Sequence, residues 1–96
     1  MVLDRLLIQC YNVYYVYQIS HLNLGGIYFK RKEYNKAIKK YERVIELNPT
    51  FADAYFNLGI VYRLNGKLNK VKELFEKAIE LNPGFKERIE KLGWKM

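Results

Sequence analysis

Hydrophobic side chains recur every three or four residues along most of the chain, which is the spacing of one face of an α-helix. In residues 34–47 the apolar positions alternate with three lysines and one arginine that lie on the opposite face. Asn48-Pro49 ends this pattern, because proline cannot continue the helical hydrogen-bond ladder. The same order of features follows in residues 52–64 and 68–81, which end at Asn82-Pro83-Gly84.

These features repeat at a fixed spacing: Leu24-Gly25 recurs as Leu58-Gly59. A period of about 34 residues predicts an all-α fold, an α-α superhelix of antiparallel helix hairpins in which each repeat packs against the next. At 96 residues the chain forms one domain at most. The expected segments are an N-terminal apolar helix (1–17), a first repeat (18–51), a second repeat (52–85) and a C-terminal capping helix (86–96), whose Ile89 and Leu92 stand one period after Tyr55 and Leu58.

Residues 1–17 leave two alternatives open. Neither Pro nor Gly interrupts the apolar spacing there, which fits one long helix from about Leu3 to Arg31. The repeat register instead fits a degenerate second helix of a preceding repeat, followed by a turn between Tyr14 and Gln18. In that register Leu3, Leu7 and Cys10 stand one period before Ala37, Tyr41 and Val44. We slightly favour the separate helix.

Two positions in the first repeat carry specific structural expectations. Gly25 lies in a packing stripe with His21, Leu24 and Tyr28, and it leaves room for a neighbouring helix to approach closely. Lys32 stands where the second repeat has Gly66, at a helix end that favours a left-handed residue. We therefore expect backbone strain at Lys32.

The residues that recur identify a resemblance. Tyr55-x2-Leu58-Gly59-x2-Tyr62, then Val71-x3-Phe75-x2-Ala78, then Pro83, closely resembles the tetratricopeptide repeat (TPR). The first copy resembles it too, but has His21 where an aromatic residue is usual and Val44 where alanine is usual. The resemblance covers residues 18–85 well and residues 86–94 in part.

The resemblance implies a right-handed stack whose concave groove is lined by the first helix of each pair and binds a peptide or helix of another protein. Phe29, Phe56 and Ile60 are large apolar residues at groove-facing places, which supports a binding surface. The alternative is that the N-terminal segment or a second copy of the chain covers them. The expected partner-binding residues are Leu22, Gly26, Phe29, Lys30, Phe56, Asn57, Ile60, Arg63 and Leu64.

Some members of this family hold the terminal carboxylate of a peptide with a clamp of lysine, asparagine and arginine. The matching places here hold Leu22, Gly26, Asn57, Glu87 and Lys91. Only Asn57 fits fully, and Glu87 would repel a carboxylate. We therefore expect no such clamp.

Composition and charge narrow the function further. Hydrophobic residues make up 50% and charged residues 28%, as in a folded globular protein. The single cysteine, Cys10, rules out an intramolecular disulfide and fits a reducing, cytoplasmic location. No stretch of the sequence is apolar enough to predict a membrane span.

The sequence also lacks the marks of catalysis. There is no nucleophile beside a base, no phosphate-binding glycine loop and no metal-ligand spacing, so we expect no enzyme activity, metal or cofactor. His21, the only histidine, is expected to be a packing residue.

Two other functions were weighed against protein binding. The net charge of +7 and a basic stretch at residues 30–43 raise nucleic-acid binding, which is disfavoured because an outer helix normally carries solvated charge. Homo-oligomerisation through the aromatic N-terminal segment is the other alternative. The basic residues are Lys30, Arg31, Lys32, Lys36, Lys39, Lys40 and Arg43, and the aromatic ones are Tyr11, Tyr14, Tyr15 and Tyr17.

Overall fold

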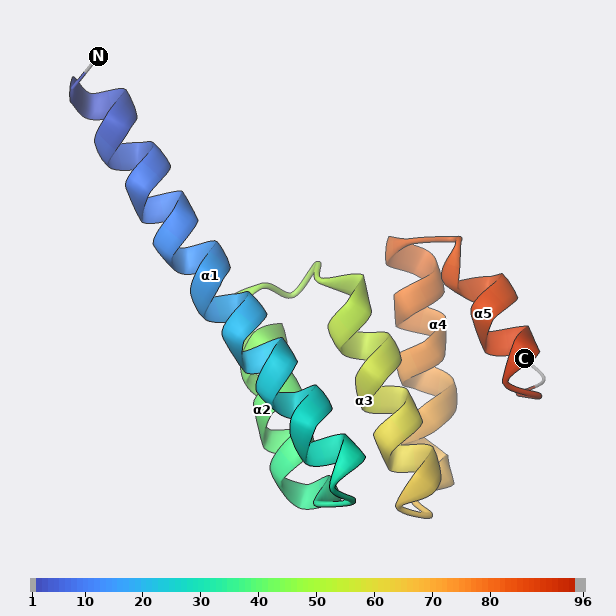
Figure 1. Cartoon of the computed structure of the whole chain (residues 1–96). Helices are drawn as coiled ribbons and strands as arrows, with labels where there is room; N and C mark the ends of the chain where they lie inside the picture. The colour runs from blue at the N-terminus through green and yellow to red at the C-terminus, as the bar shows by residue number, and fades with distance from the viewer. Residues whose placement is uncertain (1, 95–96) are drawn as a thin grey trace.

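The computed structural model describes the backbone of residues 2–94 and the side chains of residues 13–94. Every regular element in this part of the chain is helical, and the helices lie side by side as antiparallel hairpins (Figure 1). This confirms the all-α superhelix that the repeat period predicts. The elements are α1 (Val2–Lys30), α2 (Tyr34–Leu47), α3 (Ala52–Leu64), the 3₁₀ helix η1 (Leu68–Lys70), α4 (Val71–Leu81) and α5 (Phe85–Lys91).

The two hairpins end in the same way. α2 and α3 begin and end at the residues that the apolar pattern predicts. Asn48 and Asn82 cap α2 and α4 in extended conformations, with φ near −148° and −149°. Each precedes a proline, which disfavours the helical region for the residue before it. The repeated Asn-Pro pair therefore ends both outer helices.

α1 is one unbroken helix, and our preference for a separate helix before residue 18 is wrong. Tyr14 and Tyr15 stand where Asn48 and Pro49 end α2, and neither residue interrupts the helical hydrogen bonds. The N-terminal half of α1 consequently projects beyond the hairpins instead of folding back on them (Figure 1).

The turn between α1 and α2 has the expected left-handed residue. Lys32 has φ of 63°, and Gly66 in the equivalent turn has φ of 81°. The Glu33 and Lys67 amides donate to the carbonyls of Tyr28 and Tyr62, each at 2.9 Å, as in a helix end closed by a left-handed residue. The predicted strain at Lys32 is confirmed, because a side chain at this φ crowds the following carbonyl.

Replacing Lys32 by glycine is expected to raise the free energy of unfolding by about 0.5–1 kcal/mol. Relief of a left-handed side chain is worth about 1–2 kcal/mol, and the greater freedom of glycine in the unfolded chain offsets about 0.5–1 kcal/mol of it. Chemical denaturation followed by circular dichroism measures the change. Lys39→Gly, at an exposed position inside α2, is the control and should lower stability by about 1 kcal/mol. Equal losses in both variants would contradict strain at Lys32.

Close approach of helices at two glycines organises the core. A β-carbon built at Gly25 would lie 2.5 Å from the ring of Tyr41, and one at Gly59 would lie 2.5 Å from the ring of Phe75. Both aromatic rings are buried, so each outer helix places its ring directly on the backbone of its inner helix. The expectation that Gly25 provides room is confirmed.

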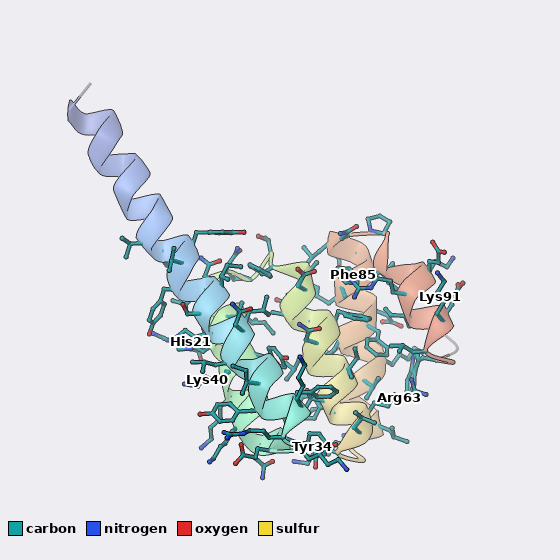
Figure 2. The ribbon with its side chains drawn as sticks, in the orientation of Figure 1. His21, Tyr34, Lys40, Arg63, Phe85 and Lys91 are labelled. Atoms are coloured by element: carbon teal, nitrogen blue, oxygen red, sulfur yellow. The ribbon has the colours of Figure 1, made fainter. Side chains whose placement is uncertain are left out.

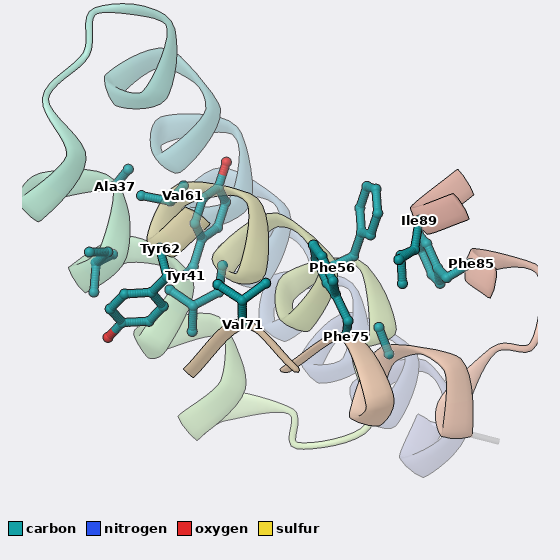
Figure 3. Packing of buried hydrophobic residues seen from close by; sticks show 12 residues of the cluster. Ala37, Tyr41, Phe56, Val61, Tyr62, Val71, Phe75, Phe85 and Ile89 are labelled. Atoms are coloured by element: carbon teal, nitrogen blue, oxygen red, sulfur yellow. The ribbon is translucent and has the colours of Figure 1, made fainter. Parts of the chain in front are cut away.

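α5 closes the C-terminal end of the stack. Phe85 and Ile89 are buried against the second hairpin, near Phe56 and Phe75 (Figure 3). The helix is shorter than the sequence pattern suggested, since it ends at Lys91. Leu92, expected to pack like Leu58, is instead exposed.

Candidate functional site

The inner faces of α1 and α3 enclose a hollow on the side of the stack away from α4. Its volume is about 430 Å³, and Tyr41 of α2 contributes to its floor. The helices that line it are the first helices of the two repeats. The lining residues are Leu22, Asn23, Gly26, Ile27, Lys30, Tyr41 and Asn57.

Gly26 keeps the centre of this hollow open. A β-carbon added there would meet only the Tyr41 hydroxyl, at 3.8 Å, which is an ordinary van der Waals contact. Burial raises the pKa of Tyr41 above its ordinary value, so its hydroxyl stays protonated near neutral pH. The hollow therefore combines apolar surface, a phenol and two carboxamides with the ammonium of Lys30, and it contains no carboxylate.

Comparison with known proteins identifies the repeats. A family model described as "TPR repeat" matches residues 25–66, and one described as "Tetratricopeptide repeat" matches residues 52–85. The chain belongs to the tetratricopeptide repeat family. TPR repeats indicate a scaffold for protein–protein interaction, and the family is in general non-catalytic.

Two crystal structures of MamA are similar to this TPR chain. One has a TM-score of 0.69 at 40% sequence identity, over 71% of this chain and 40% of that chain. The other has a TM-score of 0.64 at 31% identity, over 84% of this chain and 42% of that chain. This chain thus spans less than half the length of the MamA chains that it matches. A comparison with curated proteins gives no match.

Four of the predicted partner-binding residues meet in the hollow of the TPR groove: Leu22, Gly26, Lys30 and Asn57. The other groove residues of the sequence prediction lie around it or away from it. Phe29 is half-buried beside Tyr34, with ring centroids 6.1 Å apart, and Ile60 is half-buried against the core. Leu64, near the end of α3, is 55% exposed.

Phe56 and Arg63 do not line the hollow, although the sequence prediction placed both in the groove. Phe56 is only 4% exposed, and its ring stacks on Phe85 at 4.8 Å. Arg63 lies over the Trp94 ring at 5.8 Å and donates a hydrogen bond to the carbonyl of Leu92 at 2.9 Å. In Figure 2 Arg63 projects from α3 toward the C-terminal end of the chain. These two residues therefore hold the capping segment in place.

Asn23, Ile27 and Tyr41 were missed by sequence reasoning. The repeat register could have predicted Asn23. It follows Leu22 on the first inner helix, just as Asn57 follows Phe56 on the second. Tyr41 was assigned to packing alone, and packing does account for its ring. Only the structure shows that its hydroxyl reaches the hollow between the inner helices.

A larger hollow, of about 600 Å³, lies between α3 and α4 on the outer side of the stack. Most of its charged lining groups already contact a neighbouring side chain. Lys77 pairs with Glu80 at 3.7 Å, and the Lys70 ammonium lies 5.2 Å from the centre of the Tyr62 ring. The inner hollow is the better candidate site, because side chains of both repeats converge there.

The basic stretch at residues 30–43 is partly neutralised by its neighbours. Lys36 pairs with Glu33 at 3.5 Å, and Arg43 pairs with Glu46 at 2.8 Å. These pairs leave fewer free cations than the sequence counts, so nothing in the geometry favours nucleic acid over a protein partner.

The positions that would form a carboxylate clamp do not offer a free cation. The Lys91 ammonium pairs with the Glu87 carboxylate at 3.2 Å, so Lys91 is not a free cation for a terminal carboxylate. His21 packs edge-on to Tyr17 at 4.4 Å, and burial, with the charges of Lys40 and Arg43, lowers its pKa.

In the part of the chain that the structure describes, no three His, Cys, Asp or Glu side chains gather around one point. No helix described there is long and apolar enough to cross a bilayer.

Proposed function

We propose that this TPR chain binds an extended segment of another protein in the hollow between α1 and α3. The observation that carries the proposal is the convergence of Leu22, Gly26, Lys30 and Asn57 on one open space. Among the side chains of residues 13–94, no hydrogen bond or ion pair engages the Lys30 ammonium or the Asn57 amide. Both groups are available to a ligand.

The chemistry of the hollow supports a ligand with one apolar and one acidic side chain. The surface left bare at Gly26 accepts the apolar group, and Lys30 at the end of α1 attracts the acidic one. Asn23 and Asn57 present carboxamides, which donate to and accept from a peptide backbone. The proposed function is non-catalytic, and the single cysteine fits a reducing compartment such as the cytoplasm.

A displayed library of random decapeptides tests this function. We expect selection to enrich sequences with an acidic residue near a large apolar residue. Gly26→Leu should weaken binding of the selected peptides at least tenfold, because the leucine fills the hollow, where its β-carbon has only an ordinary contact with the Tyr41 hydroxyl at 3.8 Å. Lys30→Glu should weaken it to a similar extent by reversing the charge.

Lys72→Ala is the matched control, since Lys72 lies on the outer helix α4 and is exposed. Its peptide affinity should equal that of the wild type. Peptides that bind Gly26→Leu as tightly as the wild type would place the binding surface elsewhere.

A further inference from the structure

One face of α1 is apolar and has no partner among the described residues. Val13, Val16, Leu24 and Ile27 are between 39% and 70% exposed. They fall on one stripe with Ser20, at steps of three and four residues. An apolar stripe of this length on a helix is normally covered.

The second repeat shows what covers the equivalent face. Ala54, Leu58 and Val61 stand one repeat period after Ser20, Leu24 and Ile27, and all three are buried. Leu58 is 4% exposed where Leu24 is 39% exposed, because α2 packs against α3. Leu24, expected to be a packing residue, therefore lacks only its neighbouring helix. The place that α2 takes on α3 is open on α1.

The preceding part of the same chain does not fill this place. α1 is one continuous helix from Val2, so the described residues before Val13 extend along the helix axis, away from the hairpins, and do not fold back on the stripe (Figure 1). Among the described residues, none folds back to cover it.

The stripe is symmetric about Ser20. Val16 and Leu24 lie four residues on either side of it, and Val13 and Ile27 lie seven residues on either side. In an antiparallel pair of identical helices crossing at Ser20, Val13 would face Ile27 of the second copy and Val16 would face Leu24. A two-fold interface requires such a self-complementary surface, and the small serine allows close approach at its centre.

We propose that two copies of this chain form a two-fold symmetric dimer through antiparallel packing of their α1 helices, centred at Ser20. The proposal goes beyond peptide binding, because its surface shares only Ile27 with the inner hollow.

Charge permits this pairing. No Asp, Glu, Lys or Arg occurs from Val13 to Phe29, in a chain whose net charge is +7. Two copies thus approach through a stretch of α1 that carries no charged side chain.

The expected dimer is of moderate stability. The stripe runs along α1 from Val13 to Ile27, and a helix of that extent is roughly 21 Å long at about 1.5 Å per residue. A standard interface buries about 1,600 Å², and a single helix pair of this length buries less. We therefore expect a monomer–dimer equilibrium in the micromolar range.

Sedimentation equilibrium of the full chain at several concentrations tests the proposal. Wild type should show the dimer, and Val16→Lys or Leu24→Glu alone should weaken dimerisation at least tenfold. The double variant should restore it, because the introduced lysine of each copy then faces the introduced glutamate of the other. Leu68→Glu, at a similarly exposed leucine outside α1, is the control and should not change the dimer.

Cross-linking provides a second measurement. Ser20→Cys in a Cys10→Ser background should form a covalent dimer under mild oxidation, whereas Leu68→Cys in the same background should not. Circular dichroism confirms that each variant is folded. A wild-type monomer at all concentrations would overturn the proposal. So would a dimer that tolerates Val16→Lys, or a double variant without rescue, which would indicate a parallel or different pairing. Each of these outcomes leaves peptide binding in the inner hollow to be decided by its own experiment.

Discussion

Replacing Phe56 by alanine is expected to lower the free energy of unfolding by about 3 kcal/mol, near the lower end of the range for a buried aromatic residue. The Phe56 ring stacks on Phe85 at 4.8 Å and lies 6.0 Å from Phe75, and the Arg88 guanidinium covers it at 4.7 Å. Alanine would leave a void between α3 and α5 that the short capping helix cannot refill without losing its own contacts. Thermal and urea unfolding followed by circular dichroism measure the effect.

Leu64→Ala is the control for this prediction, because Leu64 is on the same helix but 55% exposed. Its stability should stay within about 0.5 kcal/mol of the wild type. The comparison distinguishes an apolar residue of α3 that packs against α5 from one that is exposed at the surface. A Phe56→Ala variant of unchanged stability would mean that α5 does not pack on α3, and Phe56 would return to the groove as a candidate contact.

Two glycine-to-alanine substitutions are expected to change stability in opposite directions. At Gly59 the new methyl group would lie 2.5 Å and 2.7 Å from two ring carbons of Phe75, which is fully buried. Overpacking of this kind costs about 1–3 kcal/mol. At Gly26 the methyl group meets only the Tyr41 hydroxyl, at 3.8 Å. Alanine there should raise stability by about 0.5–1 kcal/mol, because it favours a helix interior more than glycine does.

Chemical denaturation of both variants in one buffer tests this pair, and each variant serves as the control for the other. Helix propensity alone would make both substitutions stabilising. A stabilised Gly59→Ala variant would therefore contradict the close contact between α3 and the Phe75 ring. A strongly destabilised Gly26→Ala variant would contradict the open hollow in front of Gly26.

Local features of the sequence were enough to predict the two helix hairpins. Asn48-Pro49 and Asn82-Pro83-Gly84 end helices through backbone constraints that need no tertiary partner. The strain at Lys32 follows in the same way, from its alignment with Gly66. The contact of Gly25 with Tyr41 is predictable from the repeat, because the pair recurs as Gly59 and Phe75.

The candidate site was predictable in part. The register placed Leu22, Gly26, Lys30 and Asn57 on the inner face, and the structure brings these four together. The repeat register could not show that Phe56 is covered. Its equivalent in the first repeat, Leu22, lies at the open hollow. In the structure Phe56 is covered by two residues of α5, the Phe85 ring at 4.8 Å and the Arg88 guanidinium at 4.7 Å.

The sequence by itself determined the helix pairs, their period and the glycine–aromatic contacts, because each depends on residues that are near in sequence or repeat at fixed spacing. Only the tertiary structure decided the path of the chain before residue 18. α5 bends back at Pro83-Gly84 and buries Phe85 and Ile89, whereas α1 runs straight through Tyr14 and Tyr15. The physical reason is that Tyr14 and Tyr15 do not break a helix, so the local sequence permits either a turn or a continuous helix there, and packing selects one. That choice leaves Leu24 exposed and Leu58 buried at equivalent positions.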